Sequence, residues 1–241
     1  MRSIKLFFLC LITCCVYQIQ ATRLILIVHG TWATHAKWPA PGGYFFDAVE
    51  KSVLEEPDTH IIPFTWSGSH THSAREQAAK NLVKIIHSYP IDTDITIIAH
   101  SHGSNVAILA SHMLGQQKNN PYIISAMYGL STPIHTSLYF PDMNVITHFY
   151  NFFSLKDTVQ PVGGLFQRTF PLHKRIANIH LMLNGKAPNH RESHSELMGK
   201  WILSMDKFLR THHAKNLFAQ SGVIYLGDNH KPIYTIYNNR A

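Results

Sequence analysis

Six short apolar runs recur along this chain, with helical patterns between and after them. The first run, Arg-Leu-Ile-Leu-Ile-Val, is almost continuously apolar, which is typical of a strand buried on both faces of a parallel sheet. The runs occupy residues 23–28, 61–65, 94–99, 122–128, 145–153 and 176–183, and the helical patterns occupy residues 44–54, 73–87, 104–116 and 195–210. Strands and helices that alternate at these lengths predict an α/β fold with a mostly parallel, doubly wound sheet.

The tail of the chain has a different pattern. Residues 221–237 contain two short strand-like segments around Gly227-Asp228-Asn229, a turn sequence that favours a β-hairpin. We expect this hairpin to be appended to one domain that spans residues 22–241, because the chain has the length of one well-buried domain.

The first 21 residues differ from the rest. Arg2 and Lys5 are followed by an apolar run from Leu6 to Val16, and the segment ends at Ala21. This pattern predicts a cleaved secretory signal peptide, since a membrane span needs about 20 apolar residues. The alternatives are an uncleaved anchor and a lipoprotein signal. We therefore expect a secreted or periplasmic protein.

Cysteine content and charge narrow the function further. All three cysteines, Cys10, Cys14 and Cys15, lie inside the predicted signal, so the exported chain would have no disulfide, cysteine nucleophile or thiolate metal site. Loss of two basic residues leaves 19 basic against 14 acidic residues, or about +5. This charge allows peripheral contact with an anionic membrane, but its scatter argues against a nucleic-acid arm. Nothing in the sequence sets an oligomeric state.

The junction between the run at residues 94–99 and the next helical pattern reads Ala-His-Ser-His-Gly. A serine on such a tight strand-to-helix turn has a strained backbone and presents its hydroxyl above the sheet edge. The turn requires small residues two positions before and after the serine, and Ala99 and Gly103 fill those positions. A serine that caps a helix is the alternative, but the flanking patterns favour Ser101 as a nucleophile.

A nucleophilic serine also needs hydrogen-bond donors for the oxyanion. The first apolar run ends in Val-His-Gly-Thr, and Gly30 would let this loop fold close to the serine. The N–H of Thr31 is then the first predicted donor, and the N–H of His102 is the second. We interpret His29 as a structural hydrogen-bonding residue of the loop.

The acid and the base are expected at the ends of two later strands. Asp157 lies just past the fifth apolar run, where its carboxylate would reach an imidazole, although a turn role is the alternative. The loop after the sixth run holds His190 and His194. We favour His194, at the entrance to the last helical pattern, as the general base.

In the order serine, aspartate, histidine, these residues resemble the catalytic triad of α/β-hydrolases of the bacterial lipase and esterase kind. Val-His-Gly-Thr resembles the oxyanion loop of that family, and Ala-His-Ser-His-Gly resembles its Gly-His-Ser-His-Gly elbow. Ala99 replaces the first elbow glycine, and Ser104 replaces a frequent glycine after the elbow. The resemblance covers most of residues 22–210 and implies an α/β-hydrolase fold.

The resemblance also bears on the substrate. Some sixteen residues separate the run at residues 122–128 from position 145, where larger members of this fold insert a helical cap. We therefore expect a minimal or absent cap and an open site, with Trp32, Trp38, Leu138 and Phe140 as its walls. An open site favours esters of modest acyl length or lipids presented by a membrane.

These features predict a secreted serine esterase or lipase that works through an acyl-enzyme and acts on a small-molecule or lipid ester. An acyltransferase or thioesterase would use the same residues, and a non-catalytic binding protein is the alternative from another class. No His-Glu-x-x-His pattern is present, and no acidic ligands accompany the His70/His72 or His212/His213 pairs. We therefore expect no metal and no cofactor, and no nucleic-acid partner.

Overall fold

The computed structural model describes residues 23–205, 207–208, 221–228 and 230–236. The predicted signal peptide, with its three cysteines, lies outside the described residues. Among the helices that are described, none is both long and apolar enough to cross a membrane.

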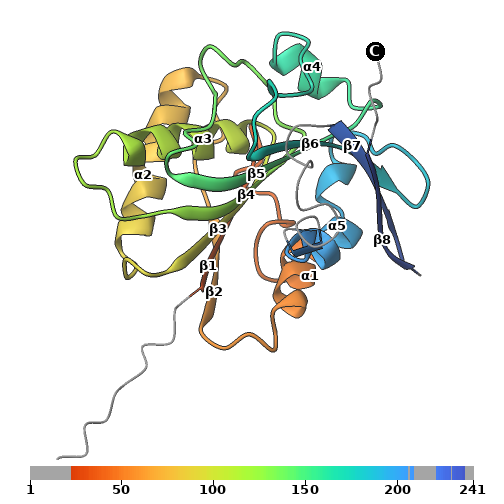
Figure 1. The fold of residues 1–241 in the computed structure, drawn as a ribbon, viewed down its shortest axis with the longest axis horizontal. Coiled ribbons are helices and arrows are strands. Elements are labelled where there is room, and N and C mark those ends of the chain that lie inside the picture. Colours follow the sequence, from red (N-terminus) through yellow and green to blue (C-terminus); the bar gives the residue numbers. More distant parts are fainter. Residues whose placement is uncertain (1–22, 206, 209–220, 229, 237–241) are drawn as a thin grey trace, which may run out of the picture.

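The described part of the chain forms one sheet of eight strands in the order β2-β1-β3-β4-β5-β6-β7-β8 (Figure 1). The strands are β1 (Arg23–Val28), β2 (Thr59–Phe64), β3 (Asp94–His100), β4 (Ile124–Leu130), β5 (Ile146–Phe153), β6 (Ile176–Leu183), β7 (Ser221–Gly227) and β8 (His230–Ile236). All neighbouring pairs are parallel except β7 and β8. The predicted α/β class and mostly parallel sheet are confirmed.

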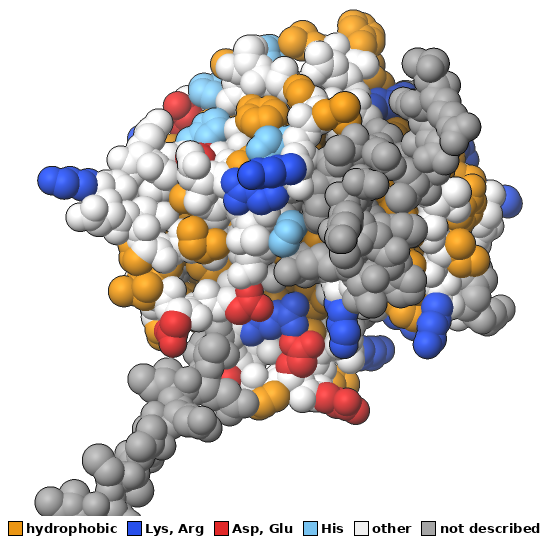
Figure 2. All heavy atoms as spheres, viewed as in Figure 1, with side chains coloured by type: hydrophobic (Ala, Val, Ile, Leu, Met, Phe, Trp, Pro, Cys, Tyr) orange, Lys and Arg blue, Asp and Glu red, His pale blue; other side chains and the backbone are white. Residues whose placement is uncertain are grey.

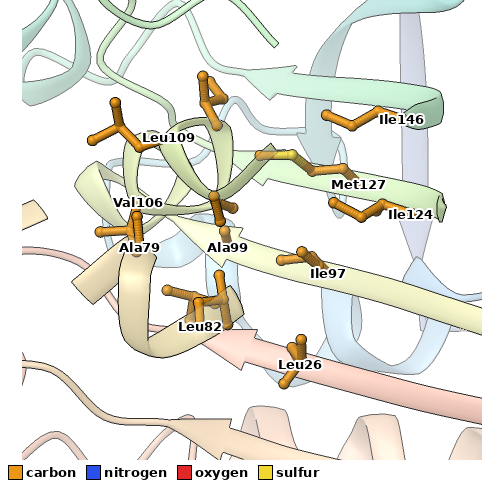
Figure 3. Close-up of a cluster of buried hydrophobic side chains, with 14 of the residues drawn as sticks. Leu26, Ala79, Leu82, Ile97, Ala99, Val106, Leu109, Ile124, Met127 and Ile146 are labelled. Atoms are coloured by element: carbon orange, nitrogen blue, oxygen red, sulfur yellow. The ribbon is translucent and has the colours of Figure 1, made fainter. Parts of the chain in front are cut away.

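Helices cover both faces of this sheet. They are α1 (Tyr44–Ser52), α2 (His72–His87), α3 (His102–Gly115), α4 (Val159–Gly163) and α5 (Glu196–Ile202), with a short 3₁₀ helix at Glu192–His194. Helices α2 and α3 pack on one face, and α1 and α5 pack together on the other. Figure 3 shows how Leu82 of α2 and Val106 of α3 meet the side chains of Leu26 and Ile97 from the strands.

The apolar runs explain this arrangement, because successive side chains of a strand point to opposite faces. In β1, Leu24 and Leu26 join the core beneath α2 and α3, whereas Ile25 and Ile27 join the core beneath α1 and α5. All four side chains are fully buried. A strand that is buried on both faces is therefore apolar at most of its positions.

Three segments differ from the expectations. The predicted C-terminal hairpin is present, but β7 pairs with β6 in parallel, so the hairpin extends the central sheet. Helix α4 was not predicted. The helix predicted over residues 195–210 is present as α5 from Glu196 to Ile202; residues 205, 207 and 208 are helical as well, and residues 206, 209 and 210 lie outside the described residues. Only a short loop joins β4 to β5, as expected for a minimal cap.

Gly103 sits where α3 crosses the end of β1, and an alanine Cβ there would lie 2.4 Å from the backbone oxygen of His29. Backbone cannot move aside as a flexible side chain can. We predict that Gly103→Ala lowers the free energy of unfolding by about 1–3 kcal/mol, measured by urea denaturation.

Gly115→Ala is the matched control on the same helix. Its Cβ would meet only the side chain of Asp142, at an exposed position, so little or no stability should be lost. Equal stability of Gly103→Ala and the wild-type protein would contradict this account of the helix crossing.

Candidate active site

Ser101 occupies a strained position at the junction of β3 and α3. Its backbone has φ 53° and ψ −132°, a conformation that costs a non-glycine residue about 1–3 kcal/mol. The Ser101 N–H donates to the Leu130 carbonyl oxygen at 2.9 Å, which ties the turn to the end of β4. The serine is 5% exposed and contributes to the wall of a cleft.

The loop after β1 passes directly beside this serine. A Cβ placed on Gly30 would lie only 2.8 Å from the Cβ of Ser101, so a larger residue at position 30 would push the loop away. Thr31, the next residue, lines the same cleft as Ser101. The backbone of this loop therefore runs close to the serine.

His29 holds the base of this loop. Its Nδ1–H donates to the Gly30 carbonyl oxygen at 2.8 Å, and its Nε2 accepts from the Trp66 N–H at 3.2 Å. The ring is buried and stacks on the Trp66 ring, with 5.8 Å between centroids. Both nitrogens of a neutral ring are thereby used within the fold.

Asp157 is fully buried beyond the end of β5. One carboxylate oxygen accepts from the N–H groups of Val159 and Gln160 at 2.9 and 3.0 Å. The other lies 2.8 Å from Nδ1 of His190. Burial alone would raise the pKa of Asp157, but the hydrogen bonds from His190 and Gln160 outweigh it and hold that pKa below its ordinary value.

The pairing of Asp157 with His190 contradicts the expectation that His194 is the aspartate's partner. The loop after β6 turns back over β5, because the Ser154 hydroxyl donates to the Pro188 carbonyl oxygen at 2.5 Å. That contact fixes the chain two residues before His190. His194, one 3₁₀ turn further on, is carried toward α1 instead.

His194 lies in an aromatic environment on the other side of the cleft. Its ring stacks on Trp38 with 4.1 Å between centroids, and its Nδ1 lies 3.0 Å from the Tyr44 hydroxyl. Burial lowers the pKa of His194 to about 4. An imidazole in this position stays neutral near pH 7.

His100, immediately before the serine, has a role that the sequence did not indicate. Its Nε2–H donates to the His190 carbonyl oxygen at 3.0 Å, and the two rings are 4.7 Å apart. This contact joins the serine turn to the loop that carries His190. In the sequence, only the position of His100 inside the elbow pattern could have indicated this role. Tyr44 also lines the cleft, and no sequence pattern indicates it.

The cleft has a volume of about 1090 Å³. Of the predicted wall residues, Trp32 and Trp38 line it, and Trp32 is 85% exposed. Leu138 and Phe140 do not: they line a separate depression beside His112 of α3. The prediction for these two is wrong, because position 112 is eleven residues along the helix from Ser101, or about 16 Å at 1.5 Å per residue.

The described residues hold no group of three or more His, Cys, Asp or Glu side chains arranged to bind a metal ion.

The ring of His102 makes a hydrogen bond within the fold, since its Nδ1 accepts from the Asn105 amide at 3.0 Å. Its pKa is lowered to about 3, chiefly by burial.

These buried histidines predict a pH dependence of stability. Burial lowers the pKa of His29, His100, His102 and His194 in the folded chain. The unfolded chain, with histidine pKa values of about 6.5, then binds more protons between about pH 4 and 6.5. Stability is therefore complete above about pH 6.5 and is lost as the pH falls toward 4.

Urea denaturation at a series of pH values measures this loss. The substitution His194→Phe keeps a ring on Trp38 and removes one titrating group, so it should make the loss smaller. Stability that stays constant or rises on acidification through this window would contradict the buried, neutral state of these rings.

Solved structures share this architecture. Aspergillus fumigatus lipase B aligns with a TM-score of 0.50 and 13% identity over 82% of this chain and 54% of that one, so the chain spans about half the length of that lipase. A cutinase-like protein from Cryptococcus sp. aligns with a TM-score of 0.47 and 10% identity over 77% and 94% of the two chains. The fold is the α/β-hydrolase fold. No curated protein matches the sequence.

A family model gives a more specific relationship. The model described as lipase (class 3) matches residues 31–163, a segment that begins at the loop beside the serine and includes both Ser101 and Asp157. This match covers more than half of the sequence and agrees with the fold. The chain belongs to the class 3 lipase family.

Proposed function

We propose that this protein is an exported serine hydrolase that cleaves carboxylic esters with Ser101, His190 and Asp157. The class 3 lipase family and the α/β-hydrolase fold support ester hydrolysis. The observation that carries the residue assignment is the 2.8 Å contact between Asp157 and His190 beside the strained serine turn. Export rests on the signal-like first 21 residues of the sequence.

In the proposed reaction, Ser101 Oγ attacks the ester carbonyl carbon while His190 Nε2 takes the hydroxyl proton. The tetrahedral intermediate collapses, the C–O bond to the alcohol breaks, and His190 returns the proton to the leaving alcohol. Water then attacks the acyl-enzyme by the same steps and releases the acid. Asp157 keeps the Nδ1–H of His190 in place, so that Nε2 is the basic nitrogen.

The negative charge of the intermediate needs donors on the opposite side of the carbonyl. We assign the N–H groups of Thr31 and His102, as the sequence predicts. The closeness of Gly30 to Ser101 supports the first, and the position of His102 at the start of α3 supports the second. Each such donor contributes about 3–4 kcal/mol to transition-state stabilisation.

His190 is better suited than His194 to carry the proton, for an electrostatic reason. A proton taken up by His190 lies next to the Asp157 carboxylate, whereas His194 faces Trp38 and Tyr44. The imidazolium that forms during the reaction requires a nearby negative charge in a site shielded from water.

One test of this mechanism concerns the nucleophile. Ser101→Ala removes the attacking oxygen and should lower kcat/KM for a soluble nitrophenyl ester by at least about 1,000-fold, with unfolding behaviour little changed. Ser104→Ala is the control, because its hydroxyl only donates to the Ala99 carbonyl oxygen in the same turn. Full activity in Ser101→Ala would remove this serine from the mechanism.

Another test of the mechanism separates the two loop histidines. His190→Gln should lower kcat/KM by at least about 1,000-fold, since glutamine cannot take the proton. His194→Gln alters the stacking on Trp38 and the contact with the Tyr44 hydroxyl but removes no proton carrier, so it should cost less than about 100-fold. The same ester assay on both variants shows which substitution lowers kcat/KM more. A larger loss in His194→Gln than in His190→Gln would mean that His194 is the base.

A further inference from the structure

Five large apolar side chains are exposed in the loop after β1 and in α4 with the turn that follows it, two segments that each contribute to the wall of the cleft. We call them the apolar rim: Trp32, Val159, Val162, Leu165 and Phe166. They are 85%, 50%, 76%, 59% and 84% exposed, respectively. Single exposed apolar residues are ordinary in proteins, but four of them within residues 159–166, next to a cleft, mark a surface that contacts something else.

The backbone of the rim is unusual as well. Leu165 and Phe166 have φ 52° and 62°, a left-handed conformation that glycine or asparagine adopts with little strain. The Phe166 N–H donates to the Pro161 carbonyl oxygen at 2.7 Å, which closes this turn. Two consecutive bulky residues are thus held in a strained turn that leaves both exposed. Stability alone would favour other residues here.

The turn is also fixed to the body of the protein. A Cβ on Gly164 would lie 2.2 Å from the backbone nitrogen of Ile134, and one on Gly163 would lie 3.2 Å from Pro133. The backbone of the rim therefore packs against the loop after β4 while its side chains face outward. Figure 1 shows α4 at one extremity of the molecule, and Figure 2 shows hydrophobic side chains over that region.

The rim continues into the cleft. Trp32 and Val159 line the same cleft as Ser101. Val159, the first rim residue of α4, follows Asp157 by two positions in the chain. Its N–H donates to the Asp157 carboxylate. Any surface that covers the rim would face the cleft that contains the serine.

The charged side chains near the apolar rim indicate which kind of surface the rim contacts. Four basic side chains, Lys156, Arg168, Lys186 and Arg191, lie in the segments at the edge of the sheet that holds the cleft, against the buried Asp157 and the exposed Glu192. Lys156 and Arg168 flank the α4 part of the rim, and Arg191 lines the cleft. At the opposite edge of the sheet, the segments that lead into β2 and β3 are acidic, with Glu55, Glu56, Asp58 and Asp92, and with Asp94 at the first position of β3, and Lys174 and Arg175 precede β6 there.

We propose that the apolar rim docks the protein on an anionic lipid surface, with its side chains among the acyl chains and the flanking basic residues at the headgroups. Exposed apolar residues bordered by Lys and Arg suit such a surface. Docking there would present lipid esters to the cleft, a consequence that rests on the proposed ester hydrolysis. The docking itself does not.

The test is co-sedimentation with phosphatidylcholine vesicles prepared with and without phosphatidylglycerol. The variant Leu165→Asn/Phe166→Asn removes two apolar side chains, and asparagine tolerates the left-handed backbone, so the fold should remain intact. We expect at least about a tenfold loss of partitioning into the anionic vesicles. Hydrolysis of a soluble short-chain ester should be unchanged, since neither residue lines the cleft.

Two further variants sharpen the result. Leu54→Asn/Ile91→Asn removes two exposed apolar side chains from the acidic region and should leave vesicle binding as in the wild-type protein. Lys156→Gln should weaken binding to anionic vesicles about fivefold and leave binding to neutral vesicles unchanged.

Several outcomes would overturn the proposal. One is equal vesicle binding by the Leu165→Asn/Phe166→Asn variant and the wild-type protein. Another is an equal loss in the Leu54→Asn/Ile91→Asn control. A third is a wild-type dimer without vesicles that the rim variant converts to monomer, because the rim would then bind a second copy. Ser101→Ala should bind vesicles normally, so failure of the ester hydrolysis and failure of the docking are distinguishable.

Discussion

The strained backbone of Ser101 is the constraint on which the site depends. A serine with φ 53° between a buried strand and a helix holds its place only because the neighbouring segments leave no alternative. Gly103 lets α3 approach β1, Gly30 lets the next loop approach the serine, and the Leu130 carbonyl accepts the serine N–H. The order of the parallel strands then brings the loops after β1, β5 and β6 to the same edge of the sheet.

Around the serine, the protein separates histidines by their electrostatic surroundings. His29, His100, His102 and His194 are buried, and burial lowers the pKa of each. Asp157 is the only buried carboxylate among the described residues, and it contacts His190. Neutral rings provide packing and fixed hydrogen bonds, and we assign the transient positive charge to the one ring with a carboxylate partner. This division explains how a histidine-rich site can contain a single proton carrier.

Much of the fold and part of the candidate site could be predicted from the sequence, for physical reasons. A strand buried on both faces is mostly apolar, so β1, β3 and β6 appear directly as apolar runs, interrupted only by Thr96 in β3 and by Asn178 and His180 in β6. A tight strand-to-helix turn requires small residues two positions before and after the serine, so the elbow pattern could be recognised in the sequence. The position of Asp157 followed because carboxyl ends of parallel strands share one edge. These features depend on local chemistry and on chain order alone.

The choice between His190 and His194 depends on a contact that no local pattern encodes. The Ser154 hydroxyl binds the Pro188 carbonyl and sets the path of the loop, and a shift of four residues changes which ring reaches Asp157. The same limit applies to Leu138 and Phe140, since their loop folds along α3 and away from the serine. The left-handed turn at Leu165 and Phe166 was equally hidden, because its sequence carries the residues that such turns disfavour.

The central claim is that one serine hydroxyl is activated by the folded site. A fluorophosphonate reacts with an activated serine and leaves a stable adduct, and peptide mapping by mass spectrometry locates that adduct. We expect a single adduct, on the peptide that contains Ser101, formed by the native protein and absent when the protein is first unfolded in urea. An adduct on another residue, or no adduct on the native protein, would contradict it.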